Sequence, residues 1–189
     1  MITALTLSSI LLWVSNAAII YLLARLLKVV RPATNAQDVT ELAAKGTDVK
    51  PLLPLTGVTL EGRSWIVESL PRATALFFIT PGCKPCENAL PGIAKNARDI
   101  RAAGLEAFVL SAGNWQETRT YLSEKGIEIP AVSVEDAPFL EGLGVNTFPT
   151  AYLIDSEGSL SYADIVKPTG LDKRHLDLWI REHRLKLAA

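Results

Sequence analysis

The two cysteines of this chain, Cys83 and Cys86, stand three positions apart, where an apolar run ends and a helical pattern begins. The run Leu76–Ile79 is typical of a buried strand, and apolar residues at helical spacing continue beyond the cysteines. Two thiols three positions apart at the start of a helix can close a small disulfide ring. The unpaired N–H groups of the helix favour the thiolate form of the first cysteine. The pattern therefore predicts a strand followed by a helix that carries a pair suited to thiol–disulfide exchange.

Composition limits the number of domains and the role of the cysteines. With 189 residues, 49% of them hydrophobic, the chain can bury one domain of about 100–150 residues and leave an N-terminal remainder. The formal net charge of -1 provides no basic surplus for a nucleic-acid partner. A fold stapled by disulfides needs several pairs, whereas this chain has 2 cysteines. The pair is therefore interpreted as catalytic.

Residues 1–24 contain no charged side chain. A helix that rises about 1.5 Å per residue would cross a hydrocarbon core of about 30 Å over this length, so we expect residues 2–24 to lie in a lipid bilayer. With the basic flank Arg25, Lys28 and Arg31, residues 1–31 form the predicted transmembrane anchor. A cleaved signal peptide is the alternative, but positive charge before the apolar run and a small-residue cleavage site after it are not evident.

The basic flank also bears on orientation. Because Arg25, Lys28 and Arg31 follow the apolar segment, the positive-inside rule would keep the C-terminal part in the cytoplasm. Residues 32–53, rich in proline and small polar residues, are interpreted as a linker, with a short packed helix as the alternative. Residues 54–189 are the predicted domain.

Strand-like and helix-like patterns alternate through this domain. The predicted domain begins with a hairpin whose turn is at Glu61-Gly62. A second hairpin is predicted over 151–162, after the single strands and helices. The single strands are predicted at 75–79, 105–110 and 129–134, and helices at 83–102, 114–124, 138–143 and 172–185. The alternation indicates an α/β fold with a parallel core. The last helix is expected to bury one apolar stripe, which consists of Leu176, Trp179, Ile180 and Leu185.

Two sequence motifs carry a resemblance to a known family. "TPGCKPC" follows "LFFI", and "VNTFPTAYLID" precedes a glycine turn, in the element order of a thioredoxin fold. With "GVTLEGR" and the apolar N-terminus, the chain resembles membrane-anchored thioredoxin-like proteins of the TlpA type, and among them is most similar to the methylamine utilisation proteins of the MauD type. The resemblance runs from about residue 52 to the C-terminus. It implies a thioredoxin-like fold with an N-terminal β-hairpin extension, preceded by one transmembrane helix.

The resemblance also implies roles for individual residues. Cys83, at the exposed helix start, is expected to attack as the thiolate, and the more buried Cys86 to resolve the mixed disulfide. Phe148, Pro149 and Thr150 are expected to form a substrate-binding loop against the pair, with a cis Phe148–Pro149 bond. The alternative is a trans proline that merely begins an edge strand.

Two positions depart from the pattern of thioredoxins. Gly82 stands where a tryptophan often precedes the first cysteine, and Phe77 stands near the place of the buried acid. Glu87 is a candidate substitute for that acid, or a carboxylate favoured by the helix dipole. Lys84 either lowers the thiol pKa or is a solvated side chain. Lys84 and Glu87 are therefore the candidate pKa modulators.

Other uses of a Cys-x-x-Cys pair are less well supported. A zinc site needs two more ligands, and the histidines of the chain, His175 and His183, are predicted near the solvated side or end of the last helix. Covalent haem attachment needs histidine directly after the second cysteine, where Glu87 stands. We therefore expect no metal and no cofactor other than a redox-active Cys83–Cys86 disulfide.

A thiol peroxidase is a second enzymatic alternative. Thr80 stands three residues before Cys83, as in the peroxidatic motif, but Leu76 occupies the place of that motif's proline. Peroxide consumption by the purified protein would support this alternative.

The resemblance finally implies partners and a location. The expected partners are client protein thiols or disulfides and a membrane or soluble redox partner. The expected location is the bacterial inner membrane, with the thiol domain in the periplasm. The positive-inside rule points to the opposite orientation. The expected client is an exported enzyme resembling methylamine dehydrogenase, or a cytochrome c. An assembly factor that holds its client without turnover is the alternative, and the direction of electron flow stays open.

Overall fold

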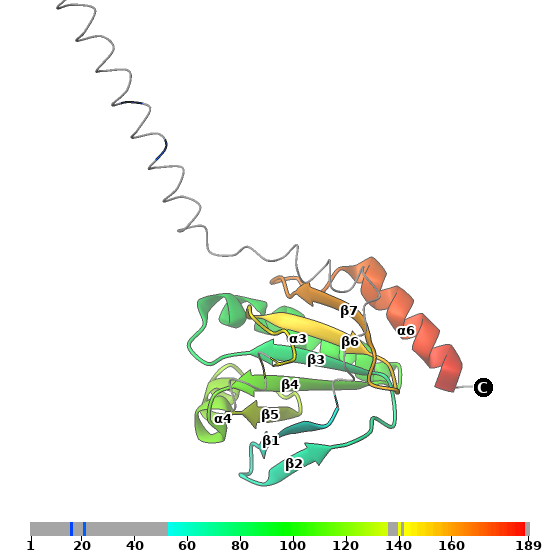
Figure 1. Cartoon of the computed structure of the whole chain (residues 1–189), viewed down its shortest axis with the longest axis horizontal. Coiled ribbons are helices and arrows are strands. Elements are labelled where there is room, and N and C mark those ends of the chain that lie inside the picture. The colour runs from blue at the N-terminus through cyan, green and yellow to red at the C-terminus, as the bar shows by residue number, and fades with distance from the viewer. Residues whose placement is uncertain (1–15, 17–20, 22–52, 136–139, 141, 188–189) are drawn as a thin grey trace, which may run out of the picture. The chain divides into compact units, whose positions relative to one another are not determined.

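Seven strands form one mixed sheet in the computed structural model, which describes residues 53–135, 140 and 142–187, together with Asn16 and Tyr21. The strands are β1 (Leu55–Thr59), β2 (Ser64–Val67), β3 (Thr74–Ile79), β4 (Glu106–Ala112), β5 (Ala131–Val134), β6 (Thr150–Ile154) and β7 (Leu160–Ile165). The helices are α3 (Lys84–Ala102), α4 (Trp115–Glu124) and α6 (Lys173–Leu187) (Figure 1). The strand order is β2-β1-β5-β4-β3-β6-β7.

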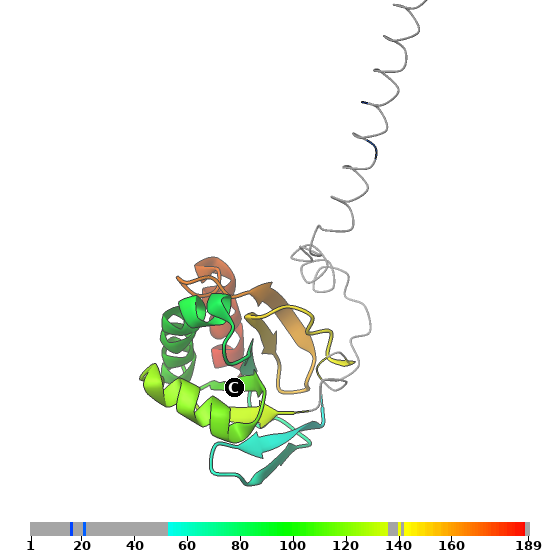
Figure 2. The same ribbon diagram turned by 90° about the vertical axis from the view of Figure 1, so that its left-hand side faces the viewer.

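The centre of the sheet is parallel, as predicted. β3 pairs with β4 and β4 with β5 in parallel, whereas β1, β2, β6 and β7 join antiparallel. The two crossovers β3-α3-β4 and β4-α4-β5 run in the same direction across the sheet. Because such crossovers are right-handed, α3 and α4 lie on the same face. Figure 2 shows these helices together on one side of the sheet.

Alternate residues of the central strands divide the core into two layers. Phe77 and Ile79 of β3 face α3, α4 and α6, and they belong to a cluster that includes Cys86, Leu122 and Trp179. Leu76 and Phe78 face the opposite side, where Leu140, Val145 and Tyr152 pack on them. β3 is therefore buried on both faces, which explains why its sequence is a continuous apolar run rather than an alternating one.

The N-terminal hairpin extends the sheet at one edge. β1 and β2 are joined through a turn in which Gly62 has φ 78°, and the Gly62 N–H donates to the Thr59 carbonyl oxygen over 2.9 Å. β1 then pairs antiparallel with β5, with Val58 opposite Ser133. The predicted hairpin at Glu61-Gly62 is confirmed, and its β1 strand is tied to the parallel core.

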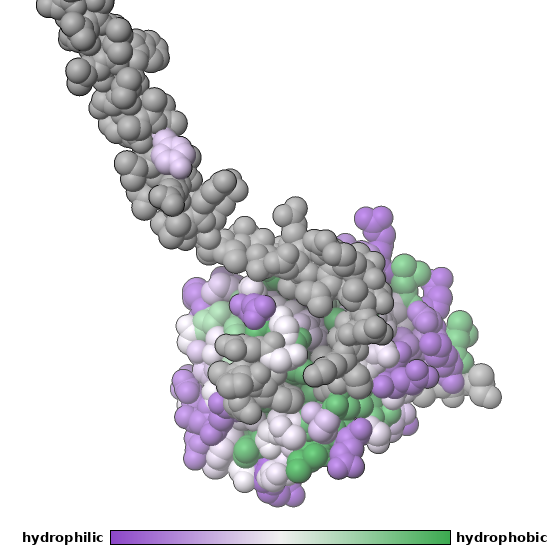
Figure 3. Space-filling model, in the orientation of Figure 1, coloured by the Kyte–Doolittle hydropathy of each residue, from purple (hydrophilic) through white to green (hydrophobic). Residues whose placement is uncertain are grey.

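Helix α6 differs from its prediction in which residues it buries. Leu176 and Trp179 are buried and Ile180 is partly buried, as expected, but Leu185 is 68% exposed. His183, predicted near the solvated side or end, is instead 5% exposed and packs on the Trp179 ring at a centroid distance of 5.2 Å. The helical period of 3.6 residues explains this, because 176, 179 and 183 share one face and 185 points away. Figure 3 shows hydrophobic spots within a largely hydrophilic surface over α6.

Several predicted segments lie outside the described residues. These are the anchor 1–31 apart from Asn16 and Tyr21, the linker 32–53 apart from its last residue, and half of the helical turn at 138–143. Within the described part of the chain, no helix has both the length and the apolar character needed to cross a bilayer. Leu140 and Gly142 are helical, in agreement with the predicted turn.

Alanine at Gly92 is expected to destabilise the domain by about 1–3 kcal/mol, because overpacking forces the backbone to shift. A Cβ atom there would lie 2.8 Å from the Pro168 carbonyl oxygen and would also press on the Gly170 backbone. Gly142→Ala is the matched control, because a Cβ at this helical position meets nothing within 4 Å among the described residues. Helix propensity predicts that Gly142→Ala is neutral or stabilising, by up to about 1 kcal/mol. Urea unfolding of the two variants measures both effects, and equal stabilities would contradict the close approach.

Candidate active site

Cys83 is the N-cap of α3, so its side chain stands at the first exposed turn of the helix. Gly82, with φ 76°, turns the chain from the end of β3 toward the cap. The Cys83 Sγ atom accepts a hydrogen bond from the Cys86 backbone N–H over 3.2 Å, and the Glu87 N–H donates to the Cys83 carbonyl oxygen over 3.0 Å. Pro85 follows in the first turn, where a missing N–H leaves no bond unmade. The sulfur therefore occupies a position where the helix end stabilises negative charge.

Cys86 lies one helical turn further on and is fully buried, whereas Cys83 is partly exposed. Both are free thiols. Burial, and next the hydrogen bond with Cys83, raises the pKa of the Cys86 thiol to about 12. The two sulfurs are thus placed in different environments, with Cys83 open to a partner and Cys86 inside the core cluster.

The loop before β6 lies against the cysteine pair. The Phe148–Pro149 peptide bond is cis, as the family resemblance implies. The Cys83 Sγ atom lies 4.0 Å from the Phe148 carbonyl oxygen. Pro149 and Thr150 are buried, and the Thr150 hydroxyl donates to the Thr147 carbonyl oxygen over 2.6 Å. Of the three predicted loop residues, Phe148 is therefore the one that is partly exposed beside Cys83.

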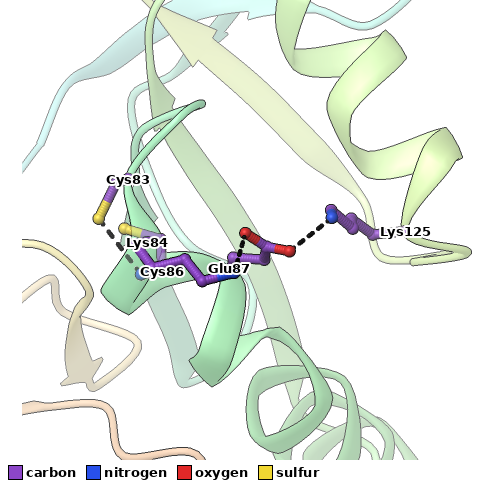
Figure 4. A network of polar contacts seen from close by, with 5 residues as sticks. All are labelled: Cys83, Lys84, Cys86, Glu87 and Lys125. Atoms are coloured by element: carbon purple, nitrogen blue, oxygen red, sulfur yellow. Dashed lines mark hydrogen bonds and ion pairs between the residues drawn. The ribbon is translucent and has the colours of Figure 1, made fainter.

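The two predicted pKa modulators bind one another rather than the thiols. The Lys84 Nζ atom lies 2.9 Å from one Glu87 carboxylate oxygen, and the Lys125 Nζ atom lies 2.7 Å from the other (Figure 4). The hydrogen bond from Lys125, and next that from Lys84, lowers the pKa of Glu87 to about 2. An acid with this pKa stays ionised at neutral pH, so Glu87 does not take the place of a neutral buried acid. Its carboxylate instead ties the start of α3 to the end of α4.

Phe77, which the sequence placed near the position of the buried acid, is 0% exposed inside the core and supplies no acid. Two further residues near the pair, Tyr121 and Lys125, were not singled out by the sequence. Tyr121 of α4 packs against the cluster that contains Cys86, and Lys125 follows it by one helical turn. An i, i+4 spacing places Tyr121 and Lys125 on the same face of α4. This spacing was readable from the sequence, but the packing of α4 against the cluster that contains Cys86 was not.

The described residues offer no cluster of three or more His, Cys, Asp or Glu side chains that could hold a metal ion. His175 stacks on the ring of Tyr162 with 4.7 Å between ring centroids. His183, also on α6, packs on Trp179. The structure thus does not bring the two histidines to the cysteine pair as ligands.

Comparison with known proteins places this site in a family. The AhpC/TSA family model matches residues 48–163, which is more than half of the chain. The chain belongs to the AhpC/TSA family. The matched residues of this AhpC/TSA chain include both cysteines and the loop at Phe148.

A curated relative of this AhpC/TSA chain is the thiol-disulfide oxidoreductase ResA of Bacillus subtilis (strain 168), which is 25% identical over 79 residues. That alignment covers 41% of this chain and 44% of ResA, so the match spans less than half of the relative's length.

Solved structures show which fold this AhpC/TSA chain has. The thioredoxin domain of a thiol-disulfide oxidoreductase from Bacteroides vulgatus matches with a TM-score of 0.57 and 18% identity, covering 67% of this chain and 92% of that domain. StoA from Bacillus subtilis matches with a TM-score of 0.53 and 19% identity, covering 68% of this chain and 98% of StoA. The fold is thioredoxin-like, as the sequence predicted.

Glutamine at Glu87 is expected to lower stability at neutral pH, because Lys84 and Lys125 would lose their shared carboxylate. The folded pKa of Glu87 is about 2, below the usual value of about 4.3 for an unfolded chain. The contribution of the carboxylate is therefore complete above about pH 4.3 and is lost as the pH falls toward 2. Thermal unfolding of both proteins across this range should show their difference shrinking with acid.

Glu182→Gln is the matched control for Glu87→Gln. Glu182 makes one exposed ion pair with Lys186 within α6, at 3.2 Å, whereas Glu87 bridges two helices. We expect the control to change stability less, since exposed pairs of this kind contribute little. A pH-independent difference between Glu87→Gln and the parent protein would contradict the ion-pair account.

Proposed function

We propose that this protein is a thiol–disulfide oxidoreductase that exchanges disulfides with client proteins. The observation that carries the proposal is the contrast between a partly exposed Cys83 at the cap of α3 and a buried Cys86 whose backbone N–H donates to the Cys83 sulfur over 3.2 Å. A structural disulfide or a metal site does not require one sulfur open and the other enclosed. Sequential attack by two thiols requires one open sulfur and one enclosed sulfur.

The exchange proceeds in two steps when the pair is reduced. The Cys83 thiolate attacks one sulfur of a client disulfide, a Cys83–client bond forms, and the second client sulfur leaves as a thiolate that takes a proton from water. Cys86, as a thiolate, then attacks the Cys83 sulfur, so the Cys83–Cys86 bond forms and the client thiolate departs. The client gains two electrons and the enzyme loses two. The reverse sequence oxidises a client dithiol.

The loop at Phe148 is proposed to present the client to Cys83. Its carbonyl oxygen lies 4.0 Å from the Cys83 sulfur, while Pro149 and Thr150 are buried behind it. An extended client segment that crosses this loop would place its own sulfur in front of Cys83. The likeness of the Phe148-Pro149-Thr150 sequence to thioredoxin-type loops supports this role.

Turnover of a disulfide-bonded client tests the proposal. The full-length chain should accelerate the reduction of insulin disulfides by dithiothreitol, measured as the turbidity of the released B chain. A protein in which both cysteines are serine should run at the uncatalysed rate. If the double variant and the parent accelerate equally, the thiol pair is not the catalyst and the proposal fails.

The location and client are proposed from the family resemblance. Residues 1–24 would tether the domain to the bacterial inner membrane with the thiols in the periplasm, as in MauD-type proteins. The client would be an exported enzyme resembling methylamine dehydrogenase, or a cytochrome c. A reporter fused after Ala189 tests the orientation, since an active cytoplasmic reporter with a silent periplasmic one would overturn it.

Two alternatives predict different outcomes. A non-turnover assembly factor would still mature its client after both cysteines are replaced, because binding alone would suffice. A thiol peroxidase would consume peroxide with a thiol reductant. The Thr80 hydroxyl donates to the Ala112 carbonyl oxygen over 2.9 Å, so it is engaged by the backbone of the neighbouring strand. We therefore favour exchange over peroxide reduction.

A further inference from the structure

Cys86 faces a difficulty in the second step of the proposed exchange. Its thiol is fully buried, and burial disfavours the charged form that must attack. The resemblance to thioredoxins puts the buried Phe77 near the place of their buried acid, and Glu87 is held ionised by two lysines. Backbone hydrogen bonds at Thr80 and Cys86 only partly oppose the rise in the pKa of the Cys86 thiol, so a side-chain donor would stabilise the developing negative charge further.

Most polar side chains around the pair are already engaged. Lys84 and Lys125 are both bound to Glu87, and the Thr80 hydroxyl donates to Ala112. Tyr121 is different. Within the described residues, the Tyr121 hydroxyl and the Trp179 indole N–H are the buried side-chain polar atoms without a hydrogen-bond partner, and Trp179 lies on α6.

Tyr121 is held close to the thiol pair by α4. Its side chain packs against the core cluster that contains Cys86. Lys125 follows on the same face of α4 and binds Glu87, the residue directly after Cys86, over 2.7 Å. Figure 4 shows this bridge reaching from the end of α4 to the start of α3. Burial, and next the charges of Cys86, Glu87 and Cys83, raises the pKa of Tyr121 to about 12, so the hydroxyl keeps its proton at neutral pH.

A groove that is open to solvent lies beside Tyr121. It has a volume of about 540 Å³ and lies between the active-site turn and α4. Pro81 and Gly82, directly before Cys83, form one wall, and Tyr121 lines the groove together with Glu117 and Glu124. Water in this groove can receive a proton released from the interior.

We propose that the Tyr121 hydroxyl donates a hydrogen bond to the Cys86 sulfur as that sulfur becomes a thiolate and attacks the mixed disulfide. The Cys86 proton leaves to water in the groove, and Tyr121 keeps its own proton. The Cys83–client bond breaks as the Cys83–Cys86 bond forms, and the client thiolate takes a proton from water. This inference rests on the proposed exchange function.

Stability and activity are expected to respond in opposite directions to the loss of this hydroxyl. A buried hydroxyl without a partner is unfavourable in the resting protein. Tyr121→Phe removes it and keeps the ring, so the variant should be as stable as the parent or more stable. A residue with only a packing role would show neither a slower reaction nor a shifted pH profile.

Ellman's reagent, an aromatic disulfide, separates the two chemical steps in the full-length chain. Attack by Cys83 releases the first coloured thiolate at a rate that depends on reagent concentration. Attack by Cys86 on the Cys83 sulfur releases the second in a concentration-independent phase. We expect Tyr121→Phe to leave the first phase unchanged and to slow the second about tenfold at neutral pH, the effect of losing one hydrogen bond to a charged group.

The pH dependence of the second phase is the decisive readout. The titratable and charged groups facing the pair are Cys83, Lys84 and Glu87 from the start of α3, Lys125 from the end of α4, and Glu117 and Glu124 on the groove wall. Tyr121→Phe alters none of them. Because the lost hydrogen bond favoured the thiolate, the profile of the variant should move to higher pH. Tyr152→Phe, which removes a hydroxyl bonded to the Leu143 carbonyl oxygen in the other core layer, should leave the profile in place.

The outcomes separate this inference from the function on which it rests. A slower second phase with a profile shifted upward supports the role of Tyr121. A second phase in Tyr121→Phe with the parent's rate and profile overturns it while leaving the exchange function standing. A parent protein that releases no second thiolate overturns the exchange function, and this inference with it.

Discussion

Serine in place of Cys83 should abolish exchange with a disulfide client, whereas serine in place of Cys86 should leave the first attack intact and trap the client. Cys83 is the partly exposed sulfur, at the helix cap and 4.0 Å from the Phe148 carbonyl oxygen. Cys86 is enclosed in the core, where a large client cannot reach it. The roles of the two sulfurs are therefore not interchangeable.

The trapping experiment compares the two variants under the same conditions. Each reduced protein is mixed with a client that carries one disulfide, alkylated, and run on a non-reducing gel. Cys86→Ser should accumulate a covalent complex that a thiol reductant dissolves, and Cys83→Ser should form none. Turnover should fall to the uncatalysed rate in both. A complex formed equally by Cys83→Ser would show that the assignment is reversed.

Alanine in place of Phe77 should destabilise the domain by about 3–5 kcal/mol, the usual cost of deleting a buried aromatic ring. Phe77 is 0% exposed on the central strand β3, in the layer that packs on α3. The same core layer holds Cys86, so the cavity would open in the layer that encloses the buried thiol. A domain with an ordinary stability of about 5–15 kcal/mol would lose a large part of it.

Phe108→Ala is the matched control for this core deletion. Phe108 lies on the adjacent strand β4 but is only partly buried, and its ring contacts Trp65 with 5.9 Å between ring centroids. We expect a smaller loss of stability, because part of the ring is already in contact with solvent. Urea unfolding monitored by circular dichroism measures both variants. Equal losses would contradict the layered core described for β3.

The local elements could be predicted because their signals are local. The apolar run of β3, the helical spacing after Cys83 and the Gly62 turn each depend on a few neighbouring residues, and each prediction is confirmed. The cis Phe148–Pro149 bond followed from family resemblance rather than from the residues themselves. Local sequence was thus enough to place the two cysteines, whereas the loop was placed by the resemblance.

Contacts between distant segments were not predictable in the same way. The sequence singled out Glu87 but neither Tyr121 nor Lys125, and only the packing of α4 beside α3 brings them together. The prediction for α6 was wrong only near its end, where Leu185 is exposed and His183 is buried. The helical period that continues from Leu176 and Trp179 favours His183 over Leu185, and the structure buries His183 against Trp179.

A redox titration of the cysteine pair tests the central claim most directly. The full-length chain is equilibrated in glutathione buffers of graded potential, the free thiols are alkylated, and the mass gives the fraction of Cys83–Cys86 disulfide. We expect one reversible two-electron transition. Its midpoint potential should be about -270 mV if the protein is a reductant, or about -120 mV if it is an oxidant. Cys83→Ser should abolish the transition. A parent protein that forms no intramolecular disulfide at any potential would contradict the account.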